Sequence, residues 1–425
     1  MMMLVAFIAF LVLLFAGVPI AFSMGLGSVI GLLVDGNNLS LIGTRLFAGV
    51  NSFSMMAIPF FMLSGEIMDK GGISQKLVNF AQACIGHVTG GLGMVDILTS
   101  MVFAGISGSA SADSAAVGAI LIPPMKEKGY PAGLAAVIQA TAGSLGPIIP
   151  PSMTMIIYCS LTNQSIGALF MAGVVPGIII GVGCLAVTYV YAKKLGIKGE
   201  RKATRKELLQ AVWSAGPALV MPLIIIGGIV GGIFTATEAG AIAVFYALIV
   251  SIYVYKGITW KDVPKILKAA AGTSAMCMLI VASANVFSWI VAYARIPQII
   301  VNFLTTLTDS KYVIMILLVI FLLFVGMFIE TISATIICAP ILMPVAAQFG
   351  IDPIQFALIM VITLVYAGVT PPVGGVLFIT MGVARAKMKE ALKYLPPYLG
   401  LVCIALLVCI FIPQLSLFLP NLLFG

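Results

Sequence analysis

The longest uncharged stretch of the chain does most to restrict what it can fold into. Residues 129–192 contain no Asp, Glu, Lys, Arg or His, and residues 1–34 carry none before Asp35. A membrane-spanning helix needs about 20 apolar residues, so the run 129–192 is too long for one span and must contain a reversal or a break. Over the whole chain 61% of the residues are hydrophobic and only 8% are charged, which excludes a soluble globular protein. The sequence predicts an all-α polytopic membrane protein with roughly ten to fourteen membrane segments.

Several classes of function are excluded by motifs that the sequence lacks. The chain has one histidine, His87, and neither an HExxH nor a GxxxxGK[ST] motif, so it is no zinc protease of that type and no P-loop ATPase. The segment GISG at 105–108 resembles the GxSG of intramembrane serine proteases, but no histidine follows Ser107 to act as its base. The seven cysteines form no CxxC pair. We therefore expect neither an enzyme nor a bound cofactor.

Two halves of the chain resemble each other. An offset of 221 aligns residues 103–151 with residues 324–372 without a gap, and ten of the 49 pairs are identical. Half of the identities are Gly or Pro pairs, and these residues constrain the backbone more than aliphatic residues do. The five are Gly105/Gly326, Pro123/Pro344, Gly129/Gly350, Pro150/Pro371 and Pro151/Pro372. We interpret the match as an internal duplication.

The charges of equivalent loops indicate how the two copies are oriented. The loop at 126–128 is charged, whereas the matching residues 347–349 are not. Conversely, three basic residues at 385–389 match an uncharged stretch near 164–170. Because basic loops favour the cytoplasm, equivalent loops are predicted on opposite sides of the membrane. That arrangement is the inverted-topology repeat of many secondary transporters.

The duplication divides the chain into three parts. We expect a first inverted repeat at 1–192, a basic cytoplasmic linker at 193–207 and a second inverted repeat at 208–425. Each repeat is expected to hold one re-entrant hairpin and one broken helix. The hairpins are predicted at about 90–125 and about 312–346, and the broken helices at about 131–160 and about 353–384.

Each repeat places Gly and paired Pro inside a long apolar stretch, at 141–152 and at 364–375. Proline removes a backbone donor and disrupts the preceding turn. Such backbone is tolerated at membrane depth only where protein or a water-filled cavity surrounds it. The carbonyls released there could coordinate a hard cation such as Na⁺, and a simple proline kink is the alternative for each break taken singly.

Small and hydroxyl-bearing residues accompany each break. The segments 105–115 and 326–335 are predicted to form re-entrant hairpin tips, and close helix packing is the alternative. Ser109 and Asp113 lie four residues apart and share a helix face. Arg295 is an isolated cation in an apolar stretch, either an anchor for a carboxylate or a residue that snorkels to the interface.

Three glutamates, Glu66, Glu238 and Glu330, also lie in apolar stretches. For Glu66 and Glu238, pairing with a nearby cation or helix end is favoured over an ion relay. Glu330 lies in the second hairpin tip, and the sequence leaves its role open.

Eight motifs together resemble the large membrane subunit of the tripartite ATP-independent periplasmic (TRAP) transporters, over nearly the whole chain. They are GVPIAF near the start, AIPFFMLSGEIM (57–68), FAGISGSASADSAAVGAI (103–120), GPIIPPS (146–152), FTATEAGAIAV (234–244), YARIPQ (293–298), GMFIETISA (326–334) and GVTPPVGG (368–375). The resemblance implies an elevator-type fold in which a transport domain moves against a scaffold. It also implies uptake of an organic acid driven by a sodium gradient, across the bacterial inner membrane.

The resemblance implies partners as well. A periplasmic substrate-binding protein (P) is expected to deliver the acid, and a separate small membrane subunit (Q) is expected because no such subunit is fused to the amino terminus. Sialic acid, C4-dicarboxylates and related carboxylates all remain open as substrates. The alternatives are a sodium/carboxylate symporter that works without a binding protein and, in a different class, an ion channel.

Site residues follow from the resemblance by motif. The first sodium site would involve Ser107, Gly146, Ile149 and Pro151. The second would involve Gly326, Ala367 and Thr370. The substrate would contact Ser107, Ser109 and Asp113, with Arg295 as the carboxylate anchor. Asp113 would repel an anion if ionised, so contact with hydroxyls or orientation of the hairpin is preferred for it.

Overall fold

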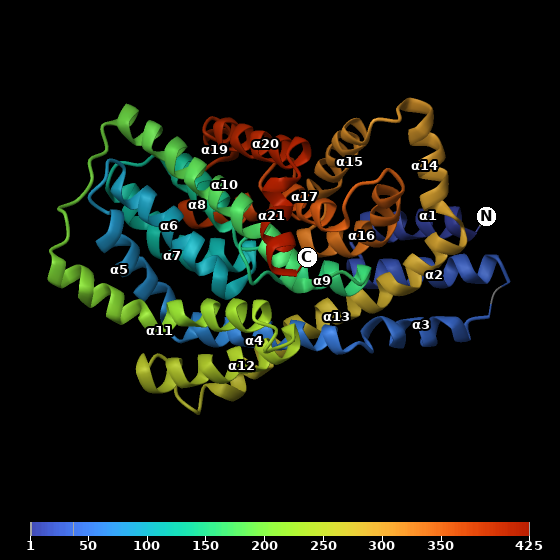
Figure 1. Ribbon diagram of the computed structural model, residues 1–425, viewed down its shortest axis with the longest axis horizontal. Coiled ribbons are helices and arrows are strands. Elements are labelled where there is room, and N and C mark those ends of the chain that lie inside the picture. Colours follow the sequence, from blue (N-terminus) through green and yellow to red (C-terminus); the bar gives the residue numbers. More distant parts are fainter. Residues whose placement is uncertain (1, 37, 425) are drawn as a thin grey trace.

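The structure is a computed structural model that describes residues 2–36 and 38–424, and regular secondary structure in this part of the chain is helical throughout (Figure 1). The helices of the first half are α1 (Met2–Phe15), α2 (Ile20–Val34), α3 (Ser40–Val50), η1 (Phe53–Met56), α4 (Ala57–Lys70), α5 (Ile73–Ile85), α6 (Gly91–Ser107), α7 (Ala110–Glu127), α8 (Ala132–Gly143), α9 (Met153–Thr162) and α10 (Ile166–Leu195). Those of the second half are α11 (Arg205–Val230), α12 (Ala236–Ile249), η2 (Val250–Val254), α13 (Val263–Tyr293), α14 (Ile296–Leu307), α15 (Lys311–Gly326), α16 (Thr331–Gln348), α17 (Pro353–Ala367), α18 (Gly375–Ala384), α19 (Met388–Leu392), α20 (Leu395–Phe411) and α21 (Gln414–Phe424).

The described residues include five helices long and apolar enough to cross a membrane, or up to seven if each of two bent pairs is one span. The bent pairs are α3 with η1–α4, at 62°, and α20 with α21, at 57°. The number of spanning helices is smaller than the roughly ten to fourteen predicted from chain length. The reason is that much of the apolar sequence lies in shorter helices of 10–17 residues. The prediction of an all-α, multi-span membrane protein with broken helices is confirmed.

The helices pack in two groups. In one, α1 packs on α2, while α2, α3 and α4 pack on α13, and α12 packs on α4. In the other, α6, α7 and α18 pack around α8, and α16 packs on α9 and α17. Helix α5 contacts α6 and α11, and α14 contacts α13 and α16, while α13 also packs directly on α16, so the groups are joined at several places (Figure 1).

Glycine allows the closest helix contact in the first group. A Cβ on Gly31 of α2 would lie 2.7 Å from the Cβ of Ala6 in α1, and one on Gly27 would lie 2.9 Å from the Ala6 carbonyl oxygen. Any larger residue at these positions would push the helices apart. Small residues therefore hold α1 and α2 together, as is common where no hydrophobic driving force acts between helices in lipid.

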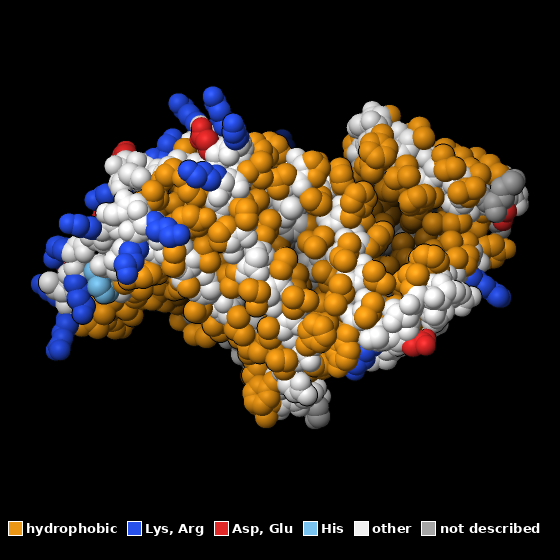
Figure 2. Space-filling model, turned by 90° about the horizontal axis from the view of Figure 1, so that it is seen from above, with side chains coloured by type: hydrophobic (Ala, Val, Ile, Leu, Met, Phe, Trp, Pro, Cys, Tyr) orange, Lys and Arg blue, Asp and Glu red, His pale blue; other side chains and the backbone are white. Residues whose placement is uncertain are grey.

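Basic loops that are far apart in the sequence meet at one end of the molecule. The Lys126 ammonium donates to the carbonyl of Ala384 at 2.7 Å, and Lys128 forms a salt bridge with Glu200 of the linker at 3.2 Å. Figure 2 shows the Lys and Arg side chains gathered there, while hydrophobic side chains cover most of the rest of that face.

The offset that aligns the two halves of the sequence also aligns their helices. Helices α7 (110–127) and α16 (331–348) both have 18 residues, and their bounds differ by the same 221 positions. Helices α8 and α17 begin at positions 132 and 353, again 221 apart. Each copy thus has a hairpin, α6–α7 or α15–α16, followed by a helix that breaks, α8–α9 or α17–α18.

Candidate functional site

The tip of the first hairpin rests directly on the first break. Helix α6 ends at Ser107, and Gly108 has φ +62°, a left-handed conformation that favours glycine. A Cβ on Gly108 would lie 2.6 Å from the carbonyl oxygen of Pro151, and the Met153 amide donates to the Gly108 carbonyl at 3.4 Å. Only glycine allows the tip to approach the break so closely.

Asp113 lies behind this tip and is completely buried. The Ser107 hydroxyl donates to its Oδ1 atom, and the Gln139 amide donates to its main-chain carbonyl at 3.2 Å. A Cβ on Gly146 would lie 2.4 Å from Oδ2, so the carboxyl faces the backbone of the break. The structure thus brings Asp113 together with Ser107 and Gly146, which were predicted for sodium.

The first break offers many oxygen atoms with free lone pairs. Among the described residues, none donates a hydrogen bond to the main-chain carbonyls of Ser144, Gly146, Ile149, Pro150 and Pro151. Three buried side-chain oxygens of this region also lack a partner there: Asp113 Oδ2, Ser114 Oγ and Gln139 Oε1. Oxygen ligands of this kind suit a hard cation. The predicted residues Ile149 and Pro151 lie within this segment, half-buried and buried respectively.

The second break has the same relation to the second hairpin. A Cβ on Gly326, at the end of α15, would lie 2.6 Å from the Cβ of Ala367, at the end of α17. The Thr370 hydroxyl donates to the Tyr366 carbonyl at 2.8 Å, and the Thr331 hydroxyl donates to that of Leu364 at 3.5 Å. Gly326 and Ala367 are therefore neighbours, with Thr370 just beyond them in the break.

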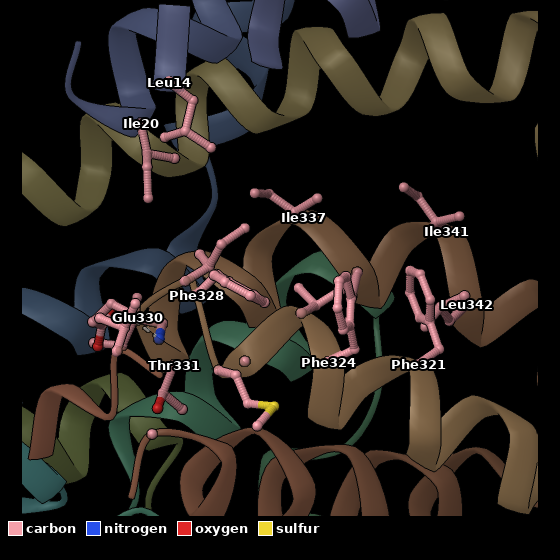
Figure 3. Close-up of a pocket in the computed structure, with 18 of the residues that line it drawn as sticks. Leu14, Ile20, Phe321, Phe324, Phe328, Glu330, Thr331, Ile337, Ile341 and Leu342 are labelled. Carbon is pink, nitrogen blue, oxygen red and sulfur yellow. Dashed lines mark hydrogen bonds between the residues drawn. The ribbon is translucent and has the colours of Figure 1, made fainter. Parts of the chain in front are cut away.

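A cavity of about 1490 Å³ lies beside both hairpin tips. Its polar wall includes Gly108, Ser109 and Ser111 at the start of α7, and Glu330 and Thr331 at the start of α16. The remaining wall is largely apolar: in Figure 3, Leu14 and Ile20 of the first helix group face Phe324, Ile337 and Ile341 of the second hairpin across the open space. Figure 2 shows a hollow in the half of the molecule away from the basic end.

The amino termini of α7 and α16 border this cavity, and they are capped by different side chains. Ser109 caps α7 by accepting a bond from the Ala112 amide at 3.4 Å. Its repeat mate Glu330 caps α16 by accepting bonds from the amides of Ile332 and Ser333 at 3.0 and 3.2 Å. A helix amino terminus carries a partial positive charge that attracts anions. The Glu330 carboxylate offsets that charge on α16. The first turn of α7 also holds an acidic residue, Asp113, but its carboxyl faces Gly146 and accepts a bond from Ser107.

Arg295 lies at the rim of the cavity. Its neighbours Ala294 and Ile296 line the wall, while its own side chain is exposed and its φ is +54°. Within the described part of the chain, no hydrogen bond or salt bridge joins Arg295 to Ser107, Ser109 or Asp113. The predicted anchor therefore stands apart from the predicted serines.

Glu66 and Glu238 do not line the cavity. Glu238 forms a capping box with Thr235 at the start of α12, where it accepts a bond from the Thr235 amide at 2.8 Å. This is the helix-end role that was favoured for it. Glu66 is half-buried on α4.

Sequence reasoning missed three residues of the cavity wall. Ser111 and Thr154 line it without having been named, and Glu330 had been given no role. Glu330 could have been found because it is the repeat mate of Ser109, and both Ser and carboxylate residues are favoured caps at helix starts. No local signal distinguishes Ser111 or Thr154 from other membrane hydroxyls.

Comparison with known proteins decides the family. A model of the "Tripartite ATP-independent periplasmic transporter, DctM component" family matches residues 7–415. The chain belongs to this family. It is a multi-pass membrane permease of a bacterial TRAP system and not an enzyme, so the resemblance read from the motifs is confirmed.

Curated relatives match most of the chain. A putative TRAP transporter large permease of Haemophilus influenzae is 41% identical over 403 residues, covering 94% of this chain and 95% of the relative. The 2,3-diketo-L-gulonate TRAP transporter large permease of Escherichia coli is 39% identical and covers 94% of both chains. An isethionate TRAP transporter permease of Oleidesulfovibrio alaskensis is also 39% identical, over 96% of this chain and 65% of the relative.

A solved structure supports the fold. The YdaH transporter of Alcanivorax borkumensis superposes with a TM-score of 0.67, at 13% sequence identity, over 88% of each chain. This likeness concerns the fold alone.

Proposed function

We propose that the chain carries out sodium-coupled uptake of an organic acid across the bacterial inner membrane. The observation that carries the proposal is the joint position of two broken helices and two hairpin tips around one cavity. Free carbonyls at the first break suit Na⁺, and the amino terminus of α7 suits a carboxylate. Among the TRAP permeases that resemble this chain, acids of different chemistry are carried at equal identity, so the identity of its acid stays open.

We further infer that the two halves are inverted-topology repeats. Loop 126–128 contacts the segment near Ala384 at the basic end. At the offset of 221, loop 126–128 corresponds to 347–349, and Ala384 corresponds to Asn163. In inverted repeats equivalent loops lie at opposite ends of the molecule, so the loops that meet at one end are not equivalent to each other. The proposed parts are the first repeat at 1–192, the linker at 193–207 and the second repeat at 208–425.

The proposed cycle is of the elevator type. The group containing α6–α10 and α15–α21 acts as the transport domain, and the group containing α1–α4 and α11–α13 acts as the scaffold. Sodium orders the two breaks, at Ser107, Gly146, Ile149 and Pro151 in one copy and at Gly326, Ala367 and Thr370 in the other. An ordered tip then holds the acid at Ser109 and Ser111. An uncompensated charge at mid-membrane is costly, so the domain crosses only loaded or empty.

Partners complete the proposed system. The isethionate relative named above carries the designation DctMQ and is about half as long again as the matched region, in line with a large and a small membrane part in one chain. We propose that this chain works with a small membrane subunit and with a periplasmic binding protein that delivers the acid.

The proposal is tested by reconstitution of the chain with its small subunit in liposomes. Uptake of the acid that the cognate binding protein holds should require an inward sodium gradient and the binding protein. Uptake at full rate in potassium-only buffer would overturn the sodium coupling. Saturable sodium-driven uptake without the binding protein would favour the simpler symporter, and unsaturable flux would favour a channel.

A further inference from the structure

A second buried carboxylate, Asp96, lies on the first hairpin well away from the cavity. Asp96, Thr99 and Ser100 of α6 are each completely buried. Both carboxylate oxygens of Asp96 lack a hydrogen-bond partner, as do the hydroxyls of Thr99 and Ser100. Because residues three and four apart share a helix face, these four oxygens lie within about one turn of the same side of α6.

The surroundings of Asp96 contain polar groups but no cation that pairs with it. One turn earlier, a Cβ on Gly93 would lie 2.8 Å from the Tyr130 hydroxyl and 2.9 Å from Thr188 of α10. The Tyr130 hydroxyl already donates to the Gly90 carbonyl at 2.6 Å. The two salt bridges formed by the described residues, Lys128–Glu200 and Arg201–Glu207, do not involve Asp96.

A buried carboxylate without a partner must be neutralised by a proton or by a cation, since leaving it charged costs many kcal/mol. A proton on Asp96 would neutralise the carboxylate without using the oxygen atoms beside it. It would also leave the hydroxyls of Thr99 and Ser100 unpaired. A cation with a preference for oxygen ligands would occupy all four oxygens at once.

We propose that Asp96, Thr99 and Ser100 form a sodium site that is separate from the two breaks. Asp96 supplies the compensating charge, and the two hydroxyls supply neutral oxygen ligands. The site lies eleven residues before Ser107 on the same helix, which places it about 16 Å from the tip. Helix α6 begins at Gly91, which lies against Glu200 of the linker, so the site is on the basic side of the tip.

The consequence is an additional ion bound per chain, held by the transport domain and not by the substrate cavity. The ion would neutralise Asp96 inside the packing of α6 against α8 and α10. The inference does not depend on the identity of the acid or on delivery by a binding protein.

The test is equilibrium binding of radioactive sodium to the purified full-length chain in detergent, without substrate. Asp96→Asn keeps the shape of a protonated carboxyl but removes the charge, so it should lower the number of ions bound per chain by one. Ser100→Ala and Thr99→Val should raise the sodium concentration for half-saturation of one class of sites about tenfold. Asp309→Asn, at an exposed position before α15, is the matched control and should bind as the wild type does.

Each result decides the question. If Asp96→Asn binds as many ions as the wild type, Asp96 carries a proton and the sodium site is refuted. If that variant does not elute as a folded protein, Ser100→Ala and Thr99→Val decide, and unchanged binding in both refutes the site. If the wild type binds no sodium at all, the proposed sodium coupling and the Asp96 site are both refuted. If sodium binding is lost only at the two breaks and one ion still binds in a manner that depends on Asp96, the Asp96 site stands.

Discussion

At the scale of the residue, three acidic side chains of similar type have different surroundings. Asp113 accepts a bond from a hydroxyl and faces a glycine backbone, Asp96 shares a face of its helix with two unpaired hydroxyls, and Glu330 caps a helix at the cavity. All three are acids in apolar sequence, so their types alone predict the same behaviour. Their different surroundings therefore predict different roles for the three residues.

Arg295 provides the prediction at this scale. Its backbone is left-handed, a conformation that Asn tolerates better than Ala, so Arg295→Asn removes the guanidinium with least strain. We expect this variant to lose at least about 90% of acid uptake while its melting temperature stays close to that of the wild type. Arg295→Lys should recover little, because an ammonium cannot form two parallel bonds to a carboxylate.

Lys311→Ala is the matched control for Arg295, since Lys311 is another exposed cation away from the basic linker. It should transport normally. Full uptake by Arg295→Asn would mean that Arg295 only snorkels at the membrane interface, the alternative raised from the sequence.

At the scale of the element, each break functions through its contact with a hairpin tip. Gly108 lies against Pro151 in the first copy, and Gly326 lies against Ala367 in the second. A break by itself is an irregular segment, and a hairpin tip by itself is a turn. Their contact creates the place where free main-chain carbonyls from one element meet the side chains of the other.

The Gly326–Ala367 contact can be tested by exchanging the two residues. A methyl on Gly326 would lie 2.6 Å from the Ala367 methyl, so Gly326→Ala should separate α15 from α17 and destabilise the protein by about 1–3 kcal/mol. It should also raise the sodium concentration that gives half-maximal uptake. Adding Ala367→Gly restores a single methyl between the helices and should recover most of both losses.

Thermal unfolding in detergent and sodium-dependent uptake measure the two effects. Gly382→Ala is the control, because a Cβ there would meet no atom within 4 Å. Additive losses in the Gly326→Ala/Ala367→Gly double variant would contradict a direct contact between these positions.

At the scale of the whole molecule, the two helix groups meet at several helix pairs, among them α13 with α16 and α4 with α6. A further contact is the packing of Gly105 in α6 against Pro222 in α11, where a Cβ on Gly105 would lie 3.3 Å from the Cβ of Pro222. This separation is close to that of a disulfide. A covalent bond there would join the proposed transport domain to the proposed scaffold.

We expect the Gly105→Cys/Pro222→Cys pair to form a disulfide on mild oxidation and to stop uptake, with recovery after reduction. The Gly25→Cys/Ser283→Cys pair joins α2 to α13 within one group, where the Cβ atoms would be 3.9 Å apart, and should leave uptake unchanged. Uptake in proteoliposomes, with each single cysteine variant alongside, gives the comparison. Undiminished uptake by the cross-linked first pair would rule out the elevator motion.

Much of this protein could be predicted from its sequence because the decisive signals are local. The uncharged runs require membrane helices, and the Gly and Pro residues of 141–152 and 364–375 interrupt helices through their own backbone chemistry. The matching of Gly and Pro at one offset predicts two hairpins and two breaks, and the motifs identified the family. These inferences need no knowledge of what packs against what.

Only the tertiary structure decided which way each polar side chain faces. The sequence grouped Asp113 with Ser109 as one helix face, yet packing turns its carboxyl toward Gly146, and Arg295 is left at the rim of the cavity. Nothing in the sequence singles out Asp96, yet packing buries it with no hydrogen-bond partner among the described residues. The physical reason is that a break follows from the backbone of a few residues, whereas the partner of a side chain depends on segments far away in the chain.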